Sequence, residues 1–128
     1  MFLIRKLKSF EVRVDILECV YKCLIESILM FNSVAWYGNL TVRDKSRLNK
    51  VVNVAGKVVG RKQKQPSELY NVIMKKKADR IVYDQSHPLN GSFELLPSGR
   101  RLRAARAKRN LYRNSFIPSA IRIFNSPF

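Results

Sequence analysis

The stretch DILECVYKCLIESILMFNSVAWY, Asp15 to Tyr37, does most to determine the fold of this 128-residue chain. Apolar residues recur along it every three or four positions, which is the spacing of one helix face. These residues are Leu17, Val20, Leu24, Ile28, Phe31 and Ala35. Glu18, Lys22 and Glu26 form a second stripe, in which opposite charges four residues apart attract each other. The stretch therefore predicts one long amphipathic helix, which the pair Gly38-Asn39 ends.

Two more principal helices follow. Thr41, with Asp44 three residues later, has the pattern of a helix N-terminus. Gly60 can adopt the left-handed conformation that ends a helix. The sequence thus predicts a helix from about Val42 to Val59, with an apolar face made of Leu48, Val51, Val52, Ala55 and Val59. Ser67 can cap a third helix over roughly residues 68–84.

The pattern changes after residue 84. Turn residues dominate, and Pro97-Ser98-Gly99 allows a small hairpin over 93–103. Residues 102–112 are rich in Ala and Arg and can form a helix, and Ser115 can cap a short terminal one. We therefore predict an all-α, mainly helical fold: three principal helices, then a basic, turn-rich tail with a short C-terminal helix. We expect a helical module over 1–85 and a tail over 86–128 in the same domain.

Positive charge is the main functional signal. The chain has 25 Lys and Arg against 9 Asp and Glu, a formal net charge of +16, and no acid follows Glu94. Such a segment favours a phosphate-bearing partner, RNA or DNA. The candidate nucleic-acid-binding residues are Arg100, Arg101, Arg103, Arg106, Lys108, Arg109 and Arg113. On a helix, the arginines at 103, 106, 109 and 113 would share one face. Tyr112 and Phe116 can stack on bases or pack against Ile117 and Ile121.

The sequence lacks the residues of common catalytic sites. It has a single histidine, His87, and no Walker or G-x-G-x-x-G loop. Cys19 and Cys23 lie four residues apart, and we expect reduced, mostly packed thiols. We therefore predict no enzyme activity, no cofactor and no metal site. Three charges interrupt the most apolar stretch, so we expect no membrane partner and a cytoplasmic or nuclear location.

Several segments, read in order, resemble the region that follows the polymerase in non-LTR (LINE-type, jockey/CR1-like) retrotransposon reverse transcriptases. They are Phe2 to Phe10, Trp36-Tyr37-Gly38, Leu48 to Val52, Ser86 to Leu89, Leu96 to Arg101 and Asn114 to Arg122. The resemblance implies a C-terminal piece beyond the fingers and palm. The two-aspartate motif of the polymerase and the endonuclease are missing, so neither activity passes to this chain.

About the first 60 residues also resemble the AlkB homologue eight N-terminal domain. This resemblance implies a 2-oxoglutarate-dependent dioxygenase and tRNA methyltransferase context. A non-haem iron oxygenase needs two histidines and a carboxylate, and this chain has one histidine. We do not expect either activity.

We therefore expect a non-catalytic, sequence-tolerant nucleic-acid-binding fragment from the C-terminal region of a retrotransposon RNA-directed DNA polymerase. Two alternatives stay open. The chain can be a structural module that docks on other reverse transcriptase domains or on a second copy, because it has few long apolar faces to enclose each other and a parent enzyme would have covered them. It can also be a genomic remnant without a function.

Overall fold

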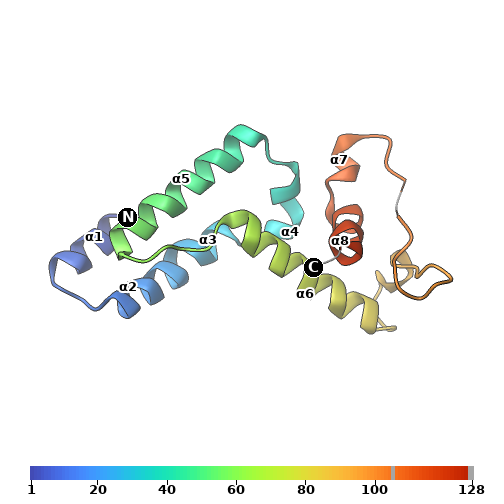
Figure 1. Cartoon of the computed structure of the whole chain (residues 1–128), viewed down its shortest axis with the longest axis horizontal. Coiled ribbons are helices and arrows are strands. Elements are labelled where there is room, and N and C mark those ends of the chain that lie inside the picture. The colour runs from blue at the N-terminus through green and yellow to red at the C-terminus, as the bar shows by residue number, and fades with distance from the viewer. Residues whose placement is uncertain (105, 127–128) are drawn as a thin grey trace. The chain divides into compact units, whose positions relative to one another are not determined.

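The computed structural model describes residues 1–104 and 106–126, and Figure 1 shows that most of them are helical. The all-α prediction is confirmed. The elements are α1 (Phe2–Ser9), α2 (Val14–Tyr21), the π-helix η1 (Lys22–Glu26), α3 (Ser27–Leu29), α4 (Ser33–Trp36), the 3₁₀ turn η2 (Tyr37–Asn39), α5 (Val42–Val59), α6 (Pro66–Tyr83), the 3₁₀ turn η3 (Asn90–Ser92), α7 (Asn110–Arg113) and α8 (Phe116–Asn125).

The chain forms two compact units. The first unit comprises Met1–Phe31 and Leu40–Leu69, and the second comprises Asn32–Asn39 and Tyr70–Phe128. Charge differs between them: Asp79, Asp84 and Glu94 are the only acids in the second unit, which contains all seven candidate binding residues. The predicted division into 1–85 and 86–128 stays a prediction.

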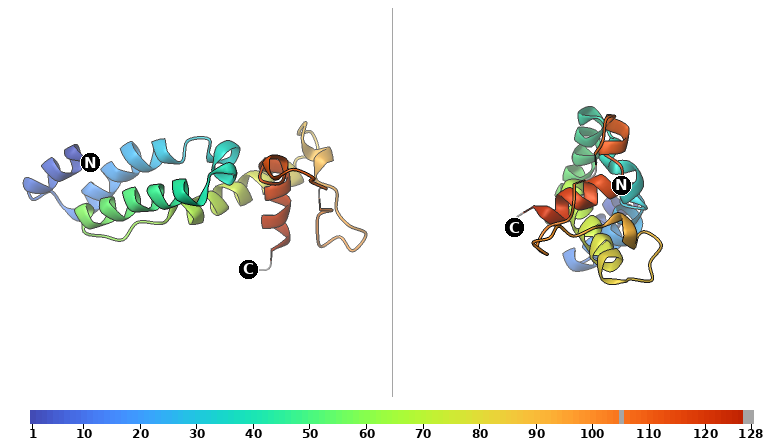
Figure 2. Two further views of the ribbon diagram at one scale, coloured as in Figure 1. Left: turned by 90° about the horizontal axis from the view of Figure 1, so that it is seen from above. Right: turned by 90° about the vertical axis from the view of Figure 1, so that its right-hand side faces the viewer.

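The core of the first unit lies where α1, α2 and α5 pack side by side, as Figure 2 shows. Its buried residues are Ile4, Leu17, Tyr21, Ala55 and Val59. Both ends of α5 follow the prediction. The Thr41 hydroxyl accepts the backbone N–H of Asp44 at 3.2 Å, and Gly60 ends the helix at φ 86°. A residue with a Cβ would be strained in that left-handed conformation, which explains the glycine.

The prediction of one helix from Asp15 to Tyr37 is wrong. The helix continues from α2 through the π-helix to α3, and then stops before Asn32, which adopts the left-handed conformation at φ 47°. The wider π-helical turn rotates the following residues relative to an ideal α-helix. Leu17 is buried, whereas Leu24 and Ile28 of the predicted apolar face are 47% and 73% exposed.

The second unit buries apolar side chains from α4, α6, α8 and the loops between them. The rings of Tyr37 and Tyr70 lie 4.7 Å apart, and those of Phe93 and Phe116 meet edge to face at 6.4 Å. The terminal helix α8 begins directly after Ser115, as predicted. Its Ala120 and Ile121 are buried and anchor the end of the chain.

The predicted hairpin is present in a minimal form. Leu95 and Leu102 make an isolated antiparallel bridge, and Leu96 N–H donates to the Arg101 carbonyl at 2.8 Å. Gly99 turns the chain at φ 67°. The prediction of a helix over 102–112 is wrong, because among the described residues of this stretch only those from Asn110 onward are helical, in α7.

Candidate nucleic-acid interface

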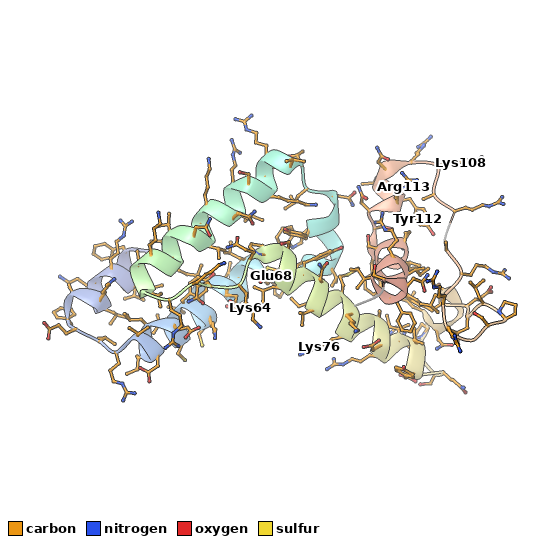
Figure 3. All side chains as sticks on the ribbon, viewed as in Figure 1. Lys64, Glu68, Lys76, Lys108, Tyr112 and Arg113 are labelled. Carbon is orange, nitrogen blue, oxygen red and sulfur yellow. The ribbon has the colours of Figure 1, made fainter. Side chains whose placement is uncertain are left out.

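All seven candidate residues are exposed, and six of them lie outside any helix. Arg100 and Arg101 belong to the hairpin turn, and Arg103 follows the bridge at Leu102. Arg106 and Lys108 lie in non-helical backbone, Arg109 precedes α7, and Arg113 is the last residue of α7. Figure 3 shows the side chains of Lys108 and Arg113 at this end of the segment. We call these seven residues the basic segment.

The predicted arginine ridge on a helix face is therefore wrong. Arg103, Arg106 and Arg109 lie outside any helix. Like charges three or four residues apart destabilise a helix, and no acid in this stretch relieves the repulsion.

The charge of the basic segment is almost uncompensated. Arg103 Nη1 lies 3.3 Å from Glu94 Oε2, and both side chains are more than half exposed. Among the described residues, no other carboxylate lies within 4.0 Å of these seven side chains. An exposed pair of this kind contributes at most about 1 kcal/mol. Arg103 therefore remains able to exchange Glu94 for a phosphate.

Arg122 completes one end of the segment, although sequence reasoning did not include it among the candidates. Its Nη2 donates to the Arg113 carbonyl at 2.8 Å and to the Ser119 hydroxyl at 3.1 Å. Arg113 and Arg122 border a small cavity of about 200 Å³, which Ala104, Ala107, Pro118 and Ile121 also line. Two guanidinium groups at one cavity favour an anion there. The contact of α8 with α7 brings Arg122 to Arg113, and the spacing of residues in the sequence does not reveal this contact.

The two aromatic candidates differ in the structure. Tyr112 is 47% exposed and lies in α7 beside Arg113, so its ring is accessible for stacking. Phe116 is half-buried: it packs against Phe93, and Lys77 Nζ lies 5.4 Å from its ring centroid. The packing interpretation thus fits Phe116 and the stacking interpretation fits Tyr112.

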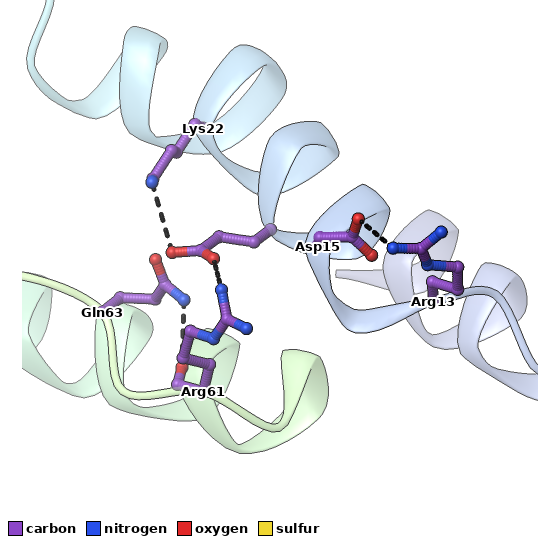
Figure 4. Close-up of polar contacts among 6 residues, drawn as sticks. Arg13, Asp15, Lys22, Arg61 and Gln63 are labelled. Carbon is purple, nitrogen blue, oxygen red and sulfur yellow. Dashed lines mark hydrogen bonds and ion pairs between the residues drawn. The ribbon is translucent and has the colours of Figure 1, made fainter.

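The charges of the first unit are more closely paired. Lys22 Nζ lies 3.2 Å from Glu18 Oε1, and Arg61 donates to Glu18 Oε2 (Figure 4). These two hydrogen bonds hold the pKa of the Glu18 carboxyl below its ordinary value. Gln63 Nε2 donates a hydrogen bond to the Arg61 carbonyl at 2.9 Å, and Arg13 Nη2 lies 3.0 Å from Asp15 Oδ2. Carboxylates therefore neutralise Arg13, Lys22 and Arg61 in the first unit.

The residues do not fit the iron that the AlkB-like resemblance implies. Within the described residues, no three His, Cys, Asp or Glu side chains gather as metal ligands. The single imidazole, His87, accepts the Leu89 N–H at Nδ1 at 3.1 Å. Cys19 and Cys23 are free and exposed, so the prediction of packed thiols is wrong. The hydrogen bond of the Cys23 thiol with Cys19 raises the pKa of Cys23, which disfavours the thiolate that metals bind.

Two further observations concern the chain as a whole. Across residues 1–104 and 106–126, no helix combines the length and the apolar character that a membrane crossing requires.

Comparisons of the chain with models of protein families, with curated proteins and with solved structures find no match. The two resemblances noted in the sequence therefore stay predictions.

Proposed function

We propose that this chain is a non-catalytic, sequence-tolerant nucleic-acid-binding module. The basic segment carries the proposal. Its seven cations are exposed, and among the described residues only Arg103 has a carboxylate, that of Glu94, within 4.0 Å. Exposed guanidinium and ammonium groups displace the counterions of a phosphate backbone, and the release of these ions drives binding. Arginine adds bidentate hydrogen bonds to phosphate oxygens.

The cations of the basic segment follow each other closely from Arg100 to Arg113, which supports contacts with several neighbouring phosphates. Phosphate contacts position a nucleic acid without reading its bases. Tyr112 is the one accessible aromatic candidate, and base stacking also tolerates any sequence. We therefore expect a strong dependence of affinity on salt and little preference for sequence.

A titration of labelled single-stranded RNA and duplex DNA, each at two salt concentrations, tests the proposal. Four phosphate contacts on a single strand would give a roughly 50-fold loss of affinity between about 50 and about 200 mM salt. The proposal fails if neither nucleic acid binds at the lower concentration, or if tight binding ignores salt.

We further propose that the module derives from the C-terminal region of a retrotransposon RNA-directed DNA polymerase. The support is the ordered set of sequence resemblances, from Phe2-Leu3-Ile4 through Leu96-Pro97-Ser98 to the segment Asn114 to Arg122. The genomic DNA immediately upstream of the Met1 codon tests this origin. A decayed polymerase reading frame there supports it, and an unrelated intact sequence speaks against it.

Self-association is the second candidate function. Leu24 and Ile28 lie four residues apart on the π-helix and α3, both largely exposed, so they form an apolar stripe on the first unit. A second copy could cover this stripe. Sedimentation velocity separates the candidates: a monomer at all concentrations excludes self-association, and a dimer that Ile28→Lys dissociates supports it.

A further inference from the structure

A second cationic site lies on α6, outside the basic segment but within the second unit. A cavity of about 690 Å³ runs along this helix and its C-terminal loop. Ile73, Lys76, Lys77 and Arg80 line it from α6, and Asp84 and His87 line it from the loop. The spacing of three, one and three residues places the α6 side chains on one helix face. Lys76 is labelled in Figure 3.

The wall of this cavity is mainly apolar, and its rim is cationic. Ile73 is half-buried and Ile81, which also lines the cavity, is buried. The aliphatic stems of lysine and arginine add apolar surface while their charged ends stay in solvent. Lys77 Nζ already lies over the Phe116 ring, so Lys76 and Arg80 are the cations best placed to meet an anion.

Asp84 and His87 determine the charge and the hydrogen bonds that a ligand meets at the loop end of the cavity. Asp84 Oδ1 accepts the Ser86 backbone N–H at 3.0 Å and the Ser86 hydroxyl, and these bonds lower the pKa of the carboxyl. Asp84 therefore stays charged. With the three cations Lys76, Lys77 and Arg80, the cavity has two positive charges in excess. His87 accepts the Leu89 N–H at Nδ1, so its neutral ring carries its proton at Nε2 and can donate there.

We infer that this cavity binds one nucleotide of a single-stranded nucleic acid, with the phosphate at Lys76 and Arg80 and the base against the Ile73 wall. The inference rests on the proposed function, and it adds that the nucleic acid is single-stranded rather than duplex. A cavity of this volume suits a group the size of a nucleotide. Phosphate alone would leave the apolar wall uncovered, whereas an unstacked base covers it. A duplex keeps its bases stacked and offers only its backbone.

The double variant Lys76→Gln/Arg80→Gln tests the inference. Fluorescence anisotropy measures its affinity for a mixed-sequence single strand and for the duplex of the same sequence. We expect an about tenfold loss for the single strand, the effect of one or two charge-assisted hydrogen bonds, and a less than about twofold loss for the duplex. Arg43→Gln/Lys50→Gln, which removes two exposed cations from α5, is the matched control and should change both affinities equally.

The outcomes separate the inference from the proposed function. If the wild-type chain binds neither strand, the proposed function fails and the inference fails with it. If the wild-type chain binds but Lys76→Gln/Arg80→Gln behaves like the control, only the inference is overturned. Photo-crosslinking of a single strand that carries 4-thiouridine gives a second readout: the inference requires crosslinked peptides from residues 73–87, and crosslinks confined to residues 100–113 contradict it.

Discussion

Asn125 in α8 holds the backbone of Leu102 with both ends of its side-chain amide. Leu102 N–H donates to Asn125 Oδ1 at 2.8 Å, and Asn125 Nδ2 donates to the Leu102 carbonyl at 2.9 Å. The two residues are 23 positions apart, and Leu102 is buried. The hairpin partner bonds to Arg101 and Arg103, so the Leu102 N–H and carbonyl face the other edge, where Asn125 supplies the partners. This pair fixes the start of the basic segment to the core of the second unit.

Asn125→Ala should loosen this attachment. The loss of two hydrogen bonds to a buried backbone should lower the free energy of unfolding by about 2 kcal/mol. Urea unfolding measures the loss, and trypsin should cleave faster after the arginines at 100, 101 and 103. Asn71→Ala, at an exposed position on α6, is the control and should leave cleavage there unchanged. Equal cleavage rates in Asn125→Ala and wild type would contradict the role of the pair.

Gly38 should not tolerate a side chain. A Cβ at this position would overlap the Asn114 carbonyl oxygen and lie 3.1 Å from the Tyr70 hydroxyl. Gly38→Ala should therefore destabilise the second unit by about 1–3 kcal/mol, the usual cost of overpacking. Gly91→Ala meets no atom within 4 Å and serves as the control. Thermal unfolding compares the two variants, and equal midpoints would contradict the close approach of the turn at Gly38 to Asn114.

Tyr21→Phe should stabilise the first unit. The Tyr21 hydroxyl is fully buried and finds no hydrogen-bond partner among the described residues, and burial raises its pKa. Removal of an unsatisfied buried hydroxyl should raise the free energy of unfolding by about 1 kcal/mol. Tyr83→Phe, at a position 79% exposed, should change nothing. A destabilised Tyr21→Phe variant would mean that the hydroxyl has a partner in solution.

Glu18 should make stability depend on pH in the acid range. Its hydrogen bonds from Lys22 and Arg61 lower the pKa of the carboxyl below the ordinary value of 4.5. The native state therefore binds the proton more weakly than the unfolded state does. The stabilisation is complete above pH 4.5 and disappears as the pH falls through the lower, folded-state pKa.

Urea unfolding from pH 7 to pH 3 measures this dependence. Glu18→Gln should be less stable than wild type at pH 7, and the difference should shrink as the pH falls toward the acid end. Glu11→Gln, a change at an exposed position, is the matched control and should follow the wild-type curve. A difference between Glu18→Gln and wild type that stays constant with pH would show that the ion pairs do not stabilise the fold.

The sequence predicted those parts of the fold that depend on neighbouring residues. The ends of α5 were predicted because Thr41 and Gly60 act on the helix that they flank. The start of α8 was predicted at the right residue but for the wrong reason, because the Ser115 hydroxyl donates to the Tyr112 carbonyl at 2.6 Å and does not cap the helix. The hairpin was predicted because Pro97-Ser98-Gly99 turns the chain locally.

The errors arose where distant residues decide the conformation. The apolar spacing after Tyr21 is compatible with an ideal α-helix, but packing of Tyr21 against α5 favours the face with Leu17, and the π-helix shifts the rest. Residues 102–109 have good helix propensity, yet Asn125 holds Leu102 in an extended conformation from 23 positions away. The sequence therefore predicted which residues form the basic segment but not its shape.

Neutralisation of the basic segment tests the central claim most directly. One variant replaces all seven of its cations with glutamine. A control of equal net charge replaces seven exposed cations of the first unit with glutamine: Arg5, Lys8, Arg43, Lys50, Lys57, Lys62 and Lys64. RNA and duplex DNA binding is then measured by anisotropy from about 50 to about 200 mM salt.

We expect the dissociation constant of the segment variant to rise at least about 100-fold at the lower salt concentration, and its salt dependence to become shallow, because the phosphate contacts are gone. The control variant should keep most of the wild-type affinity and a steep salt dependence. Equal losses in the two variants would contradict the account, because net charge alone, rather than the segment from Arg100 to Arg113, would then hold the nucleic acid.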